Sequence, residues 1–281
     1  MKKLIFLLLG SLFISLKLYP QDADYEVYAI KFASMGHPSP ISDWAYGGPA
    51  KDSVNIDFVI WLIKGANGKN ILLDAGFLPD LEDARNFGVA NYIRPDSMLA
   101  KLNLKAEDIT DVILSHPHWD HIDGLGLFPK AHIWMQKEDY NYFVGWAWQK
   151  DGNHGGFNKR DIKMLVDLNL AGNVTLVDGD KEIFPGISVY TGSRHTFNSQ
   201  YVLVKSHSNK IVLASDNIWI YYSLEHLRPP SPGGTFDTTA YKKSMIKMKS
   251  LASSLKFIIP GHDAKMFSIF PAAGEGIVKI E

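Results

Sequence analysis

The chain has 281 residues, of which 46% are hydrophobic and 21% are charged, and its formal net charge is -1. This balance is typical of a globular protein with a sizeable core, and the length suits one large α/β or β-rich domain. The charge gives no reason to expect a nucleic-acid partner, and the absence of cysteine excludes both thiolate metal sites and the thiol that a lipid-anchored exported form needs.

The N-terminus has the shape of a secretory signal peptide. Two lysines precede a short apolar run, and polar residues follow from Gln21. The run is too short and too interrupted for a good membrane-spanning helix. We therefore predict a signal peptide over residues 1–21, a mature domain over 22–281, a periplasmic or secreted location, and no stable membrane insertion after signal removal. A buried first helix is the alternative.

Residues 25–33 predict a first strand, and the Gly/Pro/Ser-rich segment 36–49 predicts an exposed loop. Beyond them, the remaining elements mix helices with strands. Such an order favours sheets in the middle of the molecule and helices outside them. The predicted helices cover 94–109, 137–150 and 236–252, and the predicted strands cover 109–115, 131–136, 174–192 (two short strands around a turn) and 256–263.

A hairpin that ends in an aspartate occurs twice in the chain. Residues 55–76 predict two apolar strands around the turn GANGK, and the second strand ends at Asp74. Residues 200–216 repeat this pattern and end at Asp216. Two copies of one unit indicate a fold with two related halves.

The stretch SHPHWDHIDGLG follows the predicted strand at 109–115 and concentrates metal-binding side chains. His116 and His118 are two residues apart in an extended chain, so they point to the same side. Asp120 and His121 are about 100° apart if a helix begins there, so they reach in different directions. Four ligands placed in this way suit a centre wider than one ion.

Further ligands must come from elsewhere in the chain. His195, Asp216 and His262 each follow an apolar strand and begin a turn of small residues, where rigid scaffolds commonly carry functional groups. A bridging carboxylate such as Asp216 can hold two cations a few ångströms apart. The alternative is a structural zinc, but such sites are usually closed four-ligand shells. Seven ligands exceed that need and favour a catalytic site.

The pattern H-x-H-x-D-H together with the three later ligands resembles the metallo-β-lactamase superfamily, over roughly residues 54–265. The resemblance implies an α+β fold, an αββα sandwich of two related halves. It also implies two Zn²⁺ ions, or other divalent ions such as Co²⁺, Mn²⁺ or Fe²⁺. One ion would bind His116, His118 and His195, the other would bind Asp120, His121 and His262, Asp216 would bridge them, and Asp74 would support a ligand histidine.

Hydrolysis is the reaction class that such a centre predicts. Two ions that share a water lower its pKa towards about 7, and the hydroxide can attack a carbonyl carbon or a phosphorus. The segments SHPHWDHIDG, SRHTFNSQYVL and PGHD are similar to those of the N-acyl-homoserine lactonases. This likeness implies opening of the lactone ring of a small substrate that carries an acyl chain, whereas the bridging Asp216 argues against a true β-lactamase.

One position departs from the lactonase pattern, which typically has a substrate-binding tyrosine three residues after the bridging aspartate. Trp219 stands there. Tyr221 and Tyr222 follow closely and are predicted to substitute for the missing tyrosine. Together with Asp120, they are the predicted catalytic residues. The predicted substrate pocket contains Trp44, Tyr46, Trp146 and Trp219. His154 is interpreted as an ordinary residue of a glycine-rich loop, with substrate contact as the alternative.

Two other functions stay open on the sequence. One is a hydrolase of the same fold that acts on another lactone, a carboxylic ester or a phosphoester. The other is a non-catalytic metal-binding protein. The sequence also leaves a homodimer open.

Overall fold

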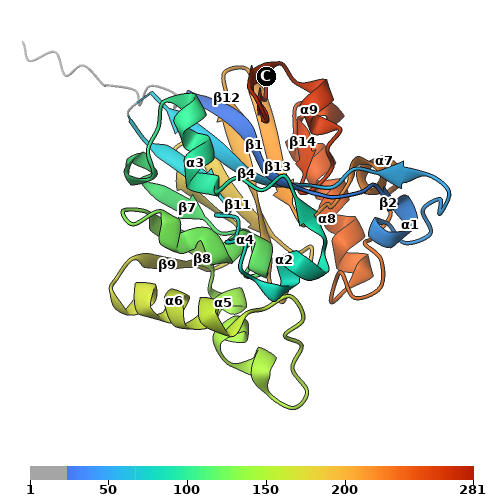
Figure 1. Cartoon of the computed structure of the whole chain (residues 1–281), viewed down its shortest axis with the longest axis horizontal. Coiled ribbons are helices and arrows are strands. Elements are labelled where there is room, and N and C mark those ends of the chain that lie inside the picture. Colours follow the sequence, from blue (N-terminus) through green and yellow to red (C-terminus); the bar gives the residue numbers. More distant parts are fainter. Residues whose placement is uncertain (1–23, 67) are drawn as a thin grey trace, which may run out of the picture.

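The computed structural model describes residues 24–66 and 68–281. Two β-sheets face each other, and helices cover their outer faces (Figure 1). This arrangement confirms the predicted αββα sandwich. The predicted signal peptide, residues 1–21, lies outside the described residues. Within the described part, none of the helices is long and apolar enough to cross a membrane.

The first sheet has nine strands in the order β15-β16-β1-β4-β5-β7-β8-β9, with β6 beside β1. Strands β5, β7, β8 and β9 run parallel to one another, and the remaining pairs of the sheet are antiparallel. The predicted first strand and the first predicted hairpin are confirmed as β1 and as β4 with β5. The bounds are β1 Tyr25–Met35, β4 Asp57–Gly65, β5 Asn70–Leu73, β6 Val89–Ala90, β7 Asp111–Ile113, β8 His132–Gln136, β9 Val174–Val177, β15 Ala272–Gly274 and β16 Ile277–Lys279.

The second sheet has five strands in the order β10-β11-β12-β13-β14. Strands β12 and β13 form the second predicted hairpin, and β14 adds to it in parallel. The first sheet contains the same unit, in which the β4–β5 hairpin is followed by the parallel strand β7. The two halves are thus related, as predicted. The bounds are β10 Lys181–Phe184, β11 Ile187–Thr191, β12 Gln200–Ser206, β13 Asn209–Ser215 and β14 Ile258–Pro260, and a separate small ribbon pairs β2 Ser39–Pro40 with β3 Ser53–Val54.

Strand β4 shows why the first sheet is covered on both faces. Trp61 and Ile63 pack into the cluster that includes the side chains of the second sheet. Ile60 and Leu62 point the other way, into a cluster shared with the helices of the first half. Because side chains alternate along a strand, a continuous apolar run fills both faces of a buried sheet.

The helices lie outside the sheets. Helix α8 packs on β13, and α5 and α6 pack on β8 and β9. Helix α8 begins where predicted because the Asp237 side chain accepts hydrogen bonds from two backbone N–H groups of its first turn. The bounds are α1 Ile41–Trp44, α2 Glu82–Asn86, α3 Pro95–Leu99, α4 Trp119–Ile122, α5 Lys137–Val144, α6 Lys159–Leu170, α7 Tyr221–His226, α8 Thr238–Leu251 and α9 Met266–Ile269.

Three predicted elements need correction. The helix predicted over 94–109 is α3 followed by two 3₁₀ turns, because Asn103 adopts a left-handed conformation with φ 58°. The helix predicted over 137–150 ends at Val144, before Gly145, and a 3₁₀ turn follows. Residues 174–192 contain three strands rather than two, and they belong to different sheets. Helix α6 was not predicted.

Candidate metal centre

The carboxyl ends of strands from both sheets meet at one edge of the sandwich. The first half contributes the segment after β7, in which a loop leads into α4, and the second half contributes the turns that follow β11, β13 and β14. The structure brings all seven predicted ligands together there, in two groups. The groups are His116, His118, His195 and Asp216, and Asp120, His121 and His262.

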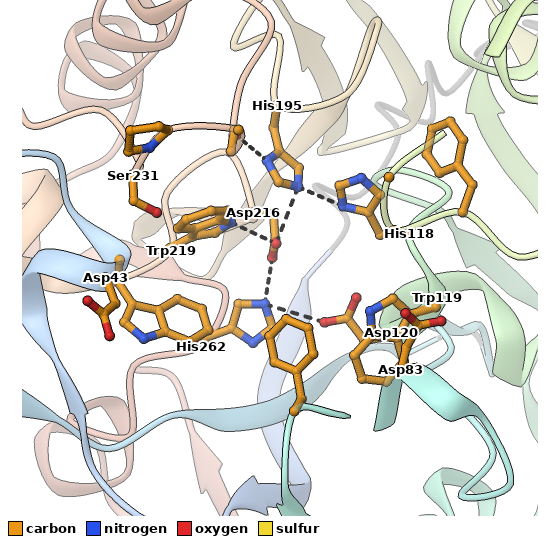
Figure 2. A pocket seen from close by; sticks show the side chains of 18 of the residues that line it. Asp43, Asp83, His118, Trp119, Asp120, His195, Asp216, Trp219, Ser231 and His262 are labelled. Carbon is orange, nitrogen blue, oxygen red and sulfur yellow. Dashed lines mark hydrogen bonds and ion pairs between the residues drawn. The ribbon is translucent and has the colours of Figure 1, made fainter. Parts of the chain in front are cut away.

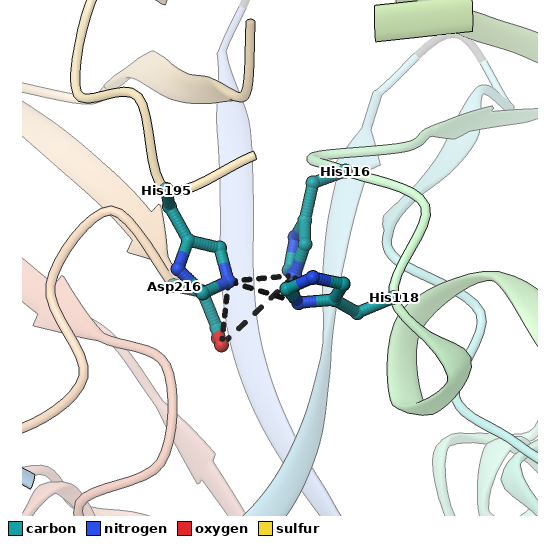
Figure 3. Close-up of side chains that lie close together, drawn as sticks. All are labelled: His116, His118, His195 and Asp216. Atoms are coloured by element: carbon teal, nitrogen blue, oxygen red, sulfur yellow. Dashed lines mark hydrogen bonds and ion pairs between the residues drawn. The ribbon is translucent and has the colours of Figure 1, made fainter. Parts of the chain in front are cut away.

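Three imidazoles of the first group converge on one point (Figure 3). His118 Nδ1 lies 3.1 Å from His116 Nε2 and 3.0 Å from His195 Nε2. The remaining pair, His195 Nε2 and His116 Nε2, is 3.2 Å apart. These spacings are close to the roughly 3.3 Å edge of a tetrahedron whose corners lie about 2.0–2.1 Å from a zinc ion. The three nitrogens therefore fit one metal position.

Asp216 joins the two groups. Its Oδ2 faces the first group, 3.4 Å from His195 Nε2. Its Oδ1 faces the second group, 2.9 Å from His262 Nε2 and 3.3 Å from His121 Nε2. Asp120 Oδ2 completes the second group, 3.4 Å from His121 Nε2. One carboxylate thus presents an oxygen to each of two candidate metal positions.

Buried polar atoms support a metal-binding role. His121 Nε2 and Asp216 Oδ1 are buried, and their polar contacts are with other members of the two groups, an arrangement that a shared cation stabilises. Burial, together with the neighbouring imidazoles, lowers the pKa of His118 to about 3 and the pKa of His116 well below its usual value. Both rings are therefore neutral at physiological pH, the form that binds metal ions. The donor set fits divalent ions.

Asp74 orients the ligands of the first half, as predicted for this position. It is fully buried, and its Oδ2 lies 2.8 Å from His121 Nδ1 and accepts hydrogen bonds from Ser115 Oγ and Ser215 Oγ. Ser115 Oγ also lies 2.8 Å from His116 Nδ1. A carboxylate that fixes the second nitrogen of a histidine sets its tautomer and leaves Nε2 for the metal.

Main-chain oxygens orient the ligands of the second half. His195 Nδ1 lies 2.8 Å from the Gly234 carbonyl oxygen, and His262 Nδ1 lies 3.1 Å from the Asp57 carbonyl oxygen. Asp216 Oδ2 accepts a 2.8 Å hydrogen bond from Trp219 Nε1. These supports were not predicted, because every residue carries a carbonyl and only the fold determines which one faces an imidazole.

A cavity of about 500 Å³ opens over the two groups (Figure 2). Its wall is aromatic, and its floor is formed by the ligands. Gly156 borders His118 so closely that a Cβ there would lie 2.8 Å from the imidazole ring. The aromatic lining residues are Trp44, Phe58, Phe87, Trp119, Phe157, Trp219 and Phe236, of which only Trp44 and Trp219 were predicted.

The other predicted pocket residues lie elsewhere. Tyr46 and Trp146 are each 59% exposed and do not line the cavity. Tyr221 and Tyr222 line a separate cavity. Tyr221 begins helix α7, where Asp263 binds its backbone N–H and its ring packs in the core. This placement corrects the prediction that these tyrosines replace the missing one.

His154 also lies off the cavity, although its neighbours Asn153 and Gly155 line it. Its ring stacks on Trp148 with ring centroids 4.8 Å apart. A stacked ring of this kind belongs to the packing of the loop. This placement agrees with the interpretation of His154 as an ordinary loop residue rather than with the alternative of substrate contact.

The cavity is lined by acidic and uncharged side chains. Asp43 and Asp83 lie at its walls together with the ligand carboxylates, and none of the described residues that line it is lysine or arginine. Burial, with the nearby carboxylates of Glu82 and Asp120, raises the pKa of Asp83. The lining side chains therefore offer no positive charge of their own to a negatively charged ligand.

Family comparison agrees with this geometry. A sequence model of the metallo-beta-lactamase superfamily matches residues 59–262, the segment that holds all seven ligands. An N-acyl homoserine lactonase of Bacillus cereus is 26% identical over 179 residues, and the lactonase AttM of Rhizobium radiobacter is 26% identical over 178 residues. Each alignment covers 62% of this chain, and the chain spans 65% of the length of these curated relatives.

Solved structures share the architecture. A crystal structure of a quorum-quenching N-acyl homoserine lactone lactonase has a TM-score of 0.68 and 21% identity, over 88% of this chain and 95% of that one. An N-acyl homoserine lactone hydrolase, solved with the product N-hexanoyl-L-homoserine at its catalytic metal centre, has a TM-score of 0.69 and 18% identity, over 88% and 96% of the two chains. At these identities the likeness establishes the fold.

Proposed function

Because the chain belongs to the metallo-β-lactamase superfamily, we propose that it is a dinuclear metal hydrolase that opens the lactone ring of N-acyl-homoserine lactones. The observation that carries the proposal is the position of Asp216, which presents one carboxylate oxygen to each of two histidine-containing groups. The curated relatives that are lactonases support the choice of substrate.

The two groups would each hold one Zn²⁺ ion, with Co²⁺, Mn²⁺ or Fe²⁺ as alternatives. When bound, such ions supply Lewis acidity and lower the pKa of water in the site. The residues of the chain do the rest. Asp74, Gly234 and Asp57 hold the imidazoles in the orientation that binds, and the aromatic wall limits access of bulk water.

Asp120 is the residue best placed to carry a proton. Burial raises its pKa, but His121 and His262 outweigh this effect, and the net shift is downward. Its carboxylate is therefore ionised at neutral pH. It pairs with His121 and His262 through Oδ2 and lines the cavity. Oδ1 is left to take a proton from the attacking water and to pass it to the leaving alkoxide oxygen of the opened ring.

The lining of the cavity supports a neutral substrate. Aromatic side chains suit an acyl chain, and the carboxylates of Asp43 and Asp83 repel an anion. An uncharged acyl lactone satisfies both conditions. A phosphodiester or a substrate with a free carboxylate does not. The signal peptide predicted over residues 1–21 extends the proposal to an enzyme that acts in the periplasm or outside the cell.

A substrate panel tests the proposal. Metal-loaded protein is incubated with acyl-homoserine lactones of several chain lengths, other lactones, p-nitrophenyl esters and phosphodiesters, and acid release is followed. We expect the acyl-homoserine lactones to be opened fastest. Chelation and the variants His118→Ala and Asp120→Asn should stop the reaction, whereas His207→Ala, in an exposed turn, should not. Full turnover in either ligand variant would contradict the mechanism.

A second candidate is hydrolysis of a different lactone or ester. Trp219 favours it, because the indole N–H at the position of the lactonase tyrosine is bonded to Asp216. Faster opening of a lactone without an acylamino group would support this candidate. Binding of two metal ions with no hydrolysis of any panel member would instead support the non-catalytic alternative.

A further inference from the structure

Trp219 is bonded to the residue that joins the two metal positions. Its Nε1 donates a 2.8 Å hydrogen bond to Asp216 Oδ2 (Figure 2). This is the oxygen that faces His195, at 3.4 Å, and His116, at 3.9 Å. The other oxygen, Oδ1, faces the second group, 2.9 Å from His262 Nε2 and 3.3 Å from His121 Nε2. The indole therefore binds the carboxylate oxygen that faces the first group.

The indole ring is held tightly in place. It packs edge to face against Trp44 and against the His195 imidazole, with ring centroids 5.5 Å and 5.6 Å apart. On its other side it touches Gly234, where a Cβ would lie 2.3 Å from the ring. Because Gly234 also accepts the hydrogen bond of His195 Nδ1, the same close contact fixes both the indole and a ligand imidazole.

The other side-chain contacts of the Asp216 carboxylate come from the proposed metal ligands themselves, His262, His121 and His195. Tyr241 binds the main-chain oxygen of Asp216 at 2.9 Å, not its side chain. Gly261 leaves room for Oδ1, since a Cβ there would lie 2.7 Å from it. A carboxylate can rotate about its last bond with low cost. The indole N–H thus holds the carboxylate plane from outside the ligand set, and its hydrogen bond stays available when the histidine nitrogens bind metal ions.

We propose that Trp219 is a positioning residue that sets the plane of the Asp216 carboxylate, and so raises the metal affinity of the group formed by His116, His118 and His195. The N–H of Trp219 is engaged with Asp216 and does not serve as a donor to the carbonyl of a substrate. The inference concerns the metal centre on which the proposed function rests, and it applies to whichever bond the enzyme hydrolyses.

The test measures metal binding in the full chain without substrate. Metal-free protein is titrated with Co²⁺, which is followed by its visible absorption and by competition with a chelator. Trp219→Phe keeps an aromatic ring and removes the N–H. We expect one of the two Co²⁺ ions to bind about tenfold more weakly and its absorption spectrum to change, as is usual when a hydrogen bond to a ligand is lost.

Trp44→Phe is the matched control. Trp44 lies in the same cavity wall, but its Nε1 donates to Ser39 Oγ, at 2.9 Å, rather than to a metal ligand. We expect its Co²⁺ affinities to stay within twofold of those of the wild type. Equal affinities and equal spectra in Trp219→Phe and the wild type would overturn the proposal, as would equal weakening in both variants.

A second pair of variants separates the hydrogen bond from packing, and it decides the question if Trp219→Phe folds poorly. Trp219→Gln and Trp219→Leu both remove the ring, and only glutamine keeps an N–H donor. We expect Trp219→Gln to bind Co²⁺ more tightly than Trp219→Leu. Equal Co²⁺ affinities in these two variants would overturn the proposal. Lactone opening is measured separately, so that absence of lactonase activity with the expected Co²⁺ result refutes the proposed function alone.

Discussion

The two halves of the sandwich supply the metal centre in different ways. The first half gives His116, His118, Asp120 and His121 from one loop and the start of one helix, backed by the side chains of Asp74 and two serines. The second half gives three ligands from three separate turns, backed mainly by main-chain oxygens. The ligands of the first half are neighbours in the sequence, whereas those of the second half are brought together only by the fold.

The largest effect should come from the residue that joins the halves. Asp216→Asn keeps the volume of the side chain but replaces one ligand oxygen by an amide NH₂. We expect lactone opening to fall by roughly 10³-fold or more, because stabilisation by a metal ion is worth several kcal/mol. Bound zinc should fall from two ions per chain to one or fewer. Activity assays and elemental analysis measure both, and two tightly bound ions in the variant would disprove the bridging role.

The second-largest effect should come from Asp74, which supports the ligands of the first half. Asp74→Asn places an amide opposite His121 Nδ1, where a carboxylate now holds the ring. We expect metal affinity and kcat/KM to fall about 10- to 100-fold. Asp111→Asn is the control, because Asp111 is also buried in the first sheet but binds Lys69, Thr110 and Trp134. If both variants lost metal affinity equally, the loss would reflect general destabilisation.

The charged cluster of Asp161, Asp123 and Arg160 should affect stability rather than catalysis. Burial and the neighbouring carboxylate of Asp123 raise the pKa of Asp161 to about 9. The folded protein then binds a proton that the unfolded chain releases above about pH 4, so this group lowers stability as the pH rises from about 4 to about 9.

Asp161→Asn removes that titration. We expect the variant to gain a few kcal/mol of stability relative to the wild type at pH 8, and little at pH 4. Thermal unfolding across this pH range measures the difference. Asp167→Asn is the control, because Asp167 is exposed on the same helix and pairs with Lys163. A stability difference between Asp161→Asn and the wild type that decreases with rising pH would refute the expectation.

The smallest effect should come from the two tyrosines. Tyr221→Phe and Tyr222→Phe remove hydroxyl groups that lie away from the cavity over the metal centre. We expect kcat/KM for lactone opening to stay within about twofold in each, since a hydroxyl group must be within hydrogen-bonding reach of the substrate to act on it. Steady-state kinetics with one lactone suffices. A tenfold loss would restore the role predicted for them from the sequence.

The contrast between the halves also explains what could be predicted from the sequence. Four ligands within six residues form a visible pattern, and the hairpins ending at Asp74 and Asp216 reveal the repeat. The substitute for the lactonase tyrosine was wrong because Ile220 and Tyr221 lead the chain into helix α7, away from the cavity. The helix over 94–109 was wrong because an asparagine in its middle can adopt a left-handed conformation.

The supports of His195 and His262 have a consequence for laboratory evolution. No codon change removes a peptide oxygen, so His262 keeps its partner whatever side chain a library places at position 57, provided that the backbone stays in place. Position 234 must stay glycine, because a Cβ there would lie 2.3 Å from the Trp219 ring. Asp74 offers no such tolerance. Randomised libraries aimed at new substrates should therefore yield more active clones when they vary the rim near the second half than when they vary residues beside Asp74.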